Sequence, residues 1–112
     1  MQDLMNELDR MKDELHRSMK MLRTNGETLA KKEHEYQLIK AKVWRVLKAE
    51  GWTSTDLNAT IKGQPEVAEA MFERDNAKVM YEANQEHINV VKLEMRVIEN
   101  QIAREWSNNG NL

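Results

Sequence analysis

The chain has 112 residues, of which 32% are charged and 5% aromatic, and its formal net charge is -2. This length suits one domain, and many charges with few aromatic side chains are typical of long solvated helices rather than of a globule with a large core. Because the chain has no cysteine, disulfide frameworks and thiolate metal sites are excluded, and the near-neutral charge gives no global attraction to nucleic acid or to an anionic membrane.

A column of apolar residues predicts a first long helix over residues 2–50. Every seventh residue from the start is apolar, as in a coiled coil: Met1, Leu8, Leu15, Leu22, Leu29, Tyr36 and Val43. The companion column becomes polar in its middle, at Ser18, Asn25 and Lys32. Asn25-Gly26 is a common turn dipeptide, so a break there stays open. We favour a continuous or kinked helix, because Leu22 and Leu29 keep one register across the site.

A short helix over about residues 54–62 is expected in the bend that follows. Gly51 can adopt the left-handed conformation that ends a helix. Thr53 or Ser54 can cap the start of the short helix, and Pro65 suits the first position of the next one. The connector therefore reverses the chain direction.

A second long helix is predicted over residues 65–107, and it carries two apolar series. The first has alternating spacings of three and four residues: Val67, Ala70, Ala77, Tyr81, Ile88, Val91, Met95, Ile98 and Ile102. The second is displaced by two residues, or about 200° around the axis: Phe72, Val79, Ala83, Val90, Leu93 and Val97. The helix therefore needs two apolar partners. Residues 108–112 are polar and are expected to form a disordered tail.

These elements predict an all-α fold: a single domain over residues 1–107, formed by a long antiparallel, coiled-coil-like helical hairpin with a short connecting helix. A hairpin covers one face of each helix, so we expect the second faces to be covered by pairing into a helical bundle, as a homodimer or a higher oligomer. The candidate residues for self-association are large apolar side chains of both long helices: Leu38, Trp44, Leu47, Phe72, Val79, Val90, Leu93 and Val97.

No arrangement of catalytic or metal-binding residues is recognisable. The three histidines, His16, His34 and His87, are scattered and belong to no Glu-x-x-His pattern. The glycines are isolated, so phosphate-binding loops and nucleophile elbows are absent from the sequence. We expect a protein that is not an enzyme and that needs neither a metal nor a cofactor.

Nucleic-acid binding near the bend is the alternative function. Basic side chains and a tryptophan gather there: Lys40, Lys42, Arg45, Lys48, Trp52 and Lys62. The cations could neutralise phosphates and the indole could stack on bases. A purely structural role is the other interpretation of these residues. In that case, the basic residues at 40, 42, 45 and 48 face acidic side chains of the returning helix, namely Glu66, Glu69, Glu73 and Asp75.

Four segments of the chain also carry a resemblance to a known group. They are AEGW at 49–52, KG at 62–63, EVAE through FERD at 66–75, and KLE through IENQIAREW at 92–106. Over residues 27–107 the chain resembles small helical proteins from phages and prophages of Gram-positive bacteria, which are encoded among early genes for recombination and replication and have no assigned biochemical role. The resemblance implies a phage origin and a partner from the replication or recombination machinery or from the host. It carries over no functional residue.

The N-terminal residues indicate a location inside the cell. Residues 1–10 alternate apolar and charged side chains and lack the apolar run of a signal peptide. No stretch has the length and hydropathy of a membrane span. We therefore expect a cytoplasmic protein of the bacterial host cell with no membrane partner.

Overall fold

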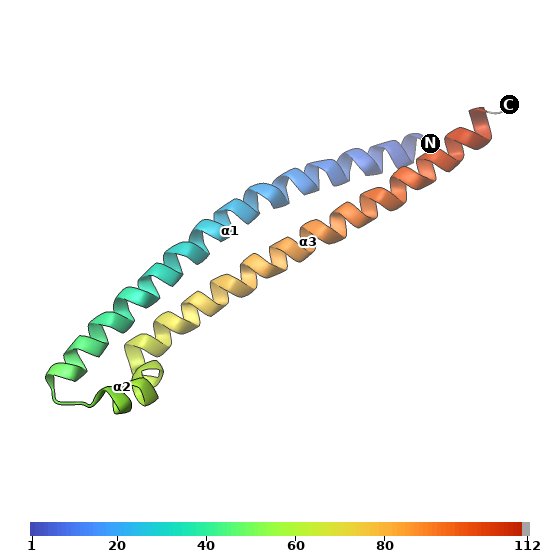
Figure 1. Cartoon of the computed structure of the whole chain (residues 1–112). Coiled ribbons are helices and arrows are strands. Elements are labelled where there is room, and N and C mark those ends of the chain that lie inside the picture. Colours follow the sequence, from blue (N-terminus) through green and yellow to red (C-terminus); the bar gives the residue numbers. More distant parts are fainter. Residues whose placement is uncertain (111–112) are drawn as a thin grey trace. The chain divides into compact units, whose positions relative to one another are not determined.

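The computed structural model describes residues 1–110, with side chains up to residue 108. In chain order its elements are α1 (Gln2–Ala49), α2 (Ser54–Thr60), the 3-10 turn η1 (Ile61–Gly63) and α3 (Pro65–Gly110) (Figure 1). Residues 1–110 contain no β-strand. The prediction of an all-α chain with two long helices and a short helix between them is confirmed.

The observed helix ends lie close to the expected ones, with two differences. The short helix ends at Thr60 and continues as η1, where a helix to residue 62 was expected. Helix α3 continues to Gly110 instead of ending at residue 107. Residues 108–110, expected in a disordered tail, are therefore helical, and the predicted tail at residues 111 and 112 lies outside the described part of the chain.

Helix α1 is unbroken through Asn25 and Gly26, so the continuous helix that we favoured is confirmed. Packing explains why a glycine is accepted inside this helix. A Cβ atom at position 26 would lie 3.4 Å from Cε2 of Tyr81, so the tyrosine ring sits directly against the α1 backbone. Burial of that ring contributes free energy that offsets the poor helix propensity of glycine.

Local hydrogen bonds cap the end of α1 and the start of α2, at the predicted positions Gly51 and Thr53. Gly51 has a φ of 100°, its N–H donates to the carbonyl of Lys48 (3.1 Å), and the N–H of Trp52 donates to the carbonyl of Leu47 (3.2 Å). This pair of bonds is a Schellman motif, which satisfies carbonyls at the end of α1. At the start of α2, Oγ1 of Thr53 accepts from the N–H of Asp56 (3.1 Å).

The chain forms two compact units, and the first comprises residues 24–81. Here the second half of α1 and the beginning of α3 run antiparallel, with α2 in the bend between them (Figure 1). Lys32 pairs with Glu73, and Lys42, further along α1, pairs with Glu66, earlier in α3. The core of this unit is a cluster of four buried residues with four partly buried neighbours: Tyr36, Ile61, Val67 and Ala70, and then Ile39, Val43, Trp44 and Met71.

The second unit comprises residues 1–23 and 82–112. The beginning of α1 and the end of α3 are also antiparallel, because Nδ2 of Asn84 donates to the carbonyl of Ser18 (3.1 Å) while the N-terminal ammonium of Met1 lies 3.3 Å from Oε2 of Glu105. The buried apolar side chains of this unit lie on one side of α3, and they are Ile88, Val91 and Ile98. Ser18 and Asn84 are buried polar residues in the same seam. In both units, the inward side of α3 is therefore the predicted first apolar series.

Candidate interaction surfaces

The second apolar series of α3 is exposed to solvent in both units. In residues 24–81, Phe72 is 67% and Val79 is 62% exposed. In the other unit, Val90 is 42%, Leu93 57% and Val97 50% exposed. These five side chains lie about half a turn around α3 from its buried series, so the described residues of the chain leave them largely uncovered.

The candidates on α1 divide into one exposed and two partly buried residues. Leu38 is 57% exposed. Trp44 packs against the core cluster of residues 24–81, and Leu47 is also partly buried. Trp44 reaches the core because it follows Tyr36 by eight residues, which returns it toward the same side of the helix. Trp44 and Leu47 therefore have less surface to offer a partner than Leu38 has.

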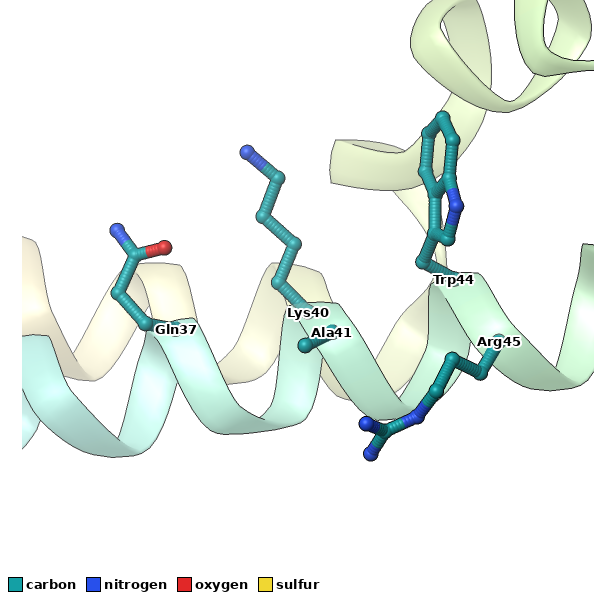
Figure 2. Close-up of a pocket in the computed structure, with 5 residues that line it drawn as sticks. All are labelled: Gln37, Lys40, Ala41, Trp44 and Arg45. Carbon is teal, nitrogen blue, oxygen red and sulfur yellow. The ribbon is translucent and has the colours of Figure 1, made fainter.

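An open hollow lies on α1 beside Trp44, within residues 24–81, and includes residues of both predicted sets. It has a volume of about 340 Å³ and is lined by Gln37, Lys40, Ala41, Trp44 and Arg45. In Figure 2, Gln37, Lys40 and Trp44 project to the same side of α1, whereas Arg45 projects away from them. The lining combines an indole and an alanine with one amide and two cationic side chains.

The basic residues near the bend are only partly neutralised. Nζ of Lys42 lies 3.7 Å from Oε2 of Glu66, and Nζ of Lys48 donates to Oγ of Ser54 (3.0 Å). The ammonium group of Lys40 lies 5.8 Å from the centre of the Tyr36 ring. The remaining members of the predicted nucleic-acid set, Arg45, Trp52 and Lys62, are exposed.

The expected pairing of the basic face of α1 with the acidic residues of α3 therefore holds for Lys42 and Glu66. Glu73 pairs instead with Lys32 (3.2 Å) and Asp75 with Arg74 (2.9 Å). Helical geometry accounts for the difference, because Arg45 follows Tyr36 by nine residues and so lies about 180° from the seam.

Arg74, which interrupts the inward series of α3, belongs to a cation–π contact that the sequence pattern did not reveal. Its guanidinium lies 4.4 Å from the centre of the buried Tyr36 ring, and its Nε is 3.5 Å from Oε2 of Glu33. The hydrogen bond to Asp75 raises the pKa of Arg74 further above its usual range. The aromatic residue in the facing column of α1 was the signal for this pair, because arginine packs well on aromatic faces.

A second polar contact across a seam lies in the unit of residues 1–23 and 82–112. Nε2 of His87 is 2.9 Å from Oε1 of Glu14, and Nη2 of Arg17 is 2.6 Å from Oε2 of the same carboxylate. The hydrogen bonds from Arg17 and His87 lower the pKa of Glu14. The side chain of His87 is half exposed.

Two other kinds of site are absent from the described residues. Among these residues, no group of three or more His, Asp or Glu side chains is arranged to hold a metal ion. No helix of the described chain combines the length and the hydropathy that crossing a membrane requires.

Comparison of the sequence and the structure with protein-family models, curated proteins and solved structures finds no match.

Proposed function

We propose that this chain is a non-enzymatic helical protein that acts by binding other proteins, including copies of itself, through the outward apolar side chains of α3. The exposure of these side chains is the observation that supports the proposal most. Phe72, Val79 and Leu93 each leave more than half of their surface in water although they belong to a well-formed helix. Burying a side chain of this size contributes about 1.5–3 kcal/mol, which is a substantial driving force for association.

The spacing of the exposed residues indicates which kind of partner fits them. Val90, Leu93 and Val97 follow one another at intervals of three and four residues. This spacing is that of the seam positions of a coiled coil, which accept the side chains of a facing helix. We therefore propose that the partner presents an amphipathic helix, as a second copy of this chain would.

The proposed setting comes from the resemblance to phage and prophage proteins. It would place the chain in the cytoplasm of a bacterial host, where the partner is a protein of phage replication or recombination or a host factor. The absence of a catalytic arrangement in the sequence supports a role in assembly or regulation of such a partner rather than in its chemistry.

Photo-crosslinking in cells tests the proposal. A benzoylphenylalanine residue is introduced at Phe72 or at Leu93, and the matched control carries it at Asp13, an exposed acidic residue of α1. Irradiation is expected to link the Phe72 and Leu93 variants to a discrete protein, and to leave the Asp13 variant unlinked. Equal yields at all three positions, or no adduct at any of them, would contradict the proposal.

Nucleic-acid binding near the bend is a second candidate function, and the exposure of Arg45, Trp52 and Lys62 favours it. A mobility-shift assay with single- and double-stranded DNA at low salt tests it. Electrostatic binding should appear at low salt, weaken as salt is raised and decrease on Arg45→Glu and Lys62→Glu substitution. If the chain leaves the DNA unshifted at low salt, this candidate is excluded.

A further inference from the structure

We infer that, within residues 24–81, the outward side of α1 in one copy docks against the outward side of α3 in a second copy. This inference rests on the proposed function and specifies how self-association occurs. The outer α1 face is defined here as Lys31, Leu38, Ala41 and Arg45, and the outer α3 face as Glu69, Phe72, Asn76 and Val79.

The outer α1 face combines an apolar centre with positive charge. Leu38 follows Tyr36, which is buried in the seam, by two residues and so lies about 200° around the helix from it. Lys31 and Arg45 stand seven residues before and after Leu38, on the same side of α1. Leu38 is 57% exposed, and Lys31 and Arg45 are exposed and form no ion pair with any described residue. Figure 2 shows Arg45 projecting away from Lys40 and Trp44.

The outer α3 face combines larger apolar side chains with negative charge. Phe72 and Val79 are 67% and 62% exposed, and Glu69 is exposed one turn before Phe72. The basic residues of this part of α3 lie elsewhere. Arg74 packs on Tyr36, and Lys78 follows Arg74 by four residues on the same side of the helix. The outer α3 face therefore has no positive charge to oppose a basic partner.

The opposite charges decide which faces meet. Pairing of two outer α3 faces would bring acidic side chains together, and pairing of two outer α1 faces would bring basic ones together. Pairing of α1 with α3 through Leu38 and Phe72 instead brings one cation, Lys31 or Arg45 according to the direction of the helices, to the end of the interface that holds Glu69 of the other copy. Exposed ion pairs add little affinity, but they select orientation and partner, while Leu38, Phe72 and Val79 supply the apolar contact.

This arrangement is heterologous, because the two faces of the interface come from different surfaces of the same chain. Each copy then offers one α1 face and one α3 face, so association continues until the copies close into a ring or extend as a filament. An isologous dimer through α3 alone would instead stop at two copies.

Disulfide trapping distinguishes these arrangements, and the absence of natural cysteine makes the full-length chain suitable for it. Leu38→Cys is mixed with an affinity-tagged Phe72→Cys or Val79→Cys chain and oxidised briefly. A disulfide forms readily only where the two Cβ atoms approach to about 4 Å. We expect the mixed pair to crosslink several-fold faster than either single variant alone, and the rate to fall as salt screens the flanking charges.

Gln37→Cys is the matched control, because Gln37 is exposed on α1 but projects to the other side of the helix from Arg45 (Figure 2), and it should crosslink slowly with either α3 variant. Faster crosslinking of Phe72→Cys with itself than with Leu38→Cys would overturn the inference and leave the proposed function standing. If no variant crosslinks and the unmodified chain sediments as a monomer, self-association itself fails.

Discussion

Apolar residues line the inward sides of α1 and α3, and a few polar residues interrupt them. The apolar columns of both long helices identified the inward positions, because helical periodicity alone fixes which residues share a side. The sequence pattern did not explain the polar residues that interrupt these columns. Gly26, Arg74 and Asn84 look unfavourable in sequence, and each has a contact across the seam: with the Tyr81 ring, with the Tyr36 ring and with the backbone carbonyl of Ser18. Such pairs are hard to predict, since they depend on the register between two helices that are distant in sequence.

Gly26 provides the first test at this scale. The approach of Tyr81, whose Cε2 would lie 3.4 Å from a Cβ at position 26, is ordinary van der Waals contact. Gly26→Ala should therefore stabilise the fold by about 0.5–1 kcal/mol, because alanine is the better helix former. Gly51→Ala is the matched control and should destabilise by about 1–2 kcal/mol, since Gly51 has a φ of 100°. Urea unfolding measures both, and destabilisation by Gly26→Ala would contradict the ordinary van der Waals contact assigned to Tyr81 and position 26.

Asn84 provides a second test. Asn84 is 7% exposed, and its Nδ2 donates to the carbonyl of Ser18 across the seam. Asn84→Ala should destabilise by about 1–2 kcal/mol, because the hydrogen bond and its packing are lost. Asn89, an exposed residue of the same helix, serves as the control, and its substitution by alanine should change stability by less than about 0.5 kcal/mol. Equal effects of the two substitutions in thermal unfolding would argue against a buried Asn84.

Glu14 gives the fold a defined dependence on pH. Arg17 and His87 lower the pKa of its carboxyl, so the folded chain favours the ionised form more than the unfolded chain does. The resulting stability is present above the usual range of glutamate pKa values and is lost as pH falls through the lowered pKa. The melting temperature of Glu14→Gln should therefore be below that of the unmodified chain at neutral pH, and the gap should close in acid. A gap that persists in acid would contradict this assignment.

At the scale of elements, the connector between the long helices was the most predictable part of the chain. Its signals are local: Gly51 ends α1, Thr53 caps α2, and Pro65 begins α3. What the sequence could not show is how α2 is held. A helix of seven residues is too short to be stable alone. Leu57 anchors it, because this side chain is completely buried within the unit of residues 24–81.

Removal of the Leu57 side chain should destabilise the fold strongly. Leu57→Ala is expected to destabilise the fold by about 2–5 kcal/mol, since it removes buried methyl groups and leaves a cavity. Asn58→Ala, at the next and exposed position, should change stability by less than about 0.5 kcal/mol. Both are measured by urea unfolding at one fixed protein concentration, because association shifts apparent stability. A small effect of Leu57→Ala would mean that α2 is not packed as described.

For the whole molecule, the second apolar series of α3 links fold to proposed function. Periodicity predicted that these residues share a side, and the structure shows them exposed in the single chain. The prediction for α1 was less accurate, because residues 38–47 are apolar on almost every side and this pattern does not show that Trp44 packs against the core.

Sedimentation equilibrium of the unmodified chain at micromolar concentrations, with helicity followed by circular dichroism, is the most direct test of the central claim that the outward side of α3 is covered by protein. We expect a fully helical species of at least twice the monomer mass, and a shift toward monomer when Phe72 and Leu93 are both changed to Asp. A stable, fully helical monomer throughout that concentration range would contradict the account.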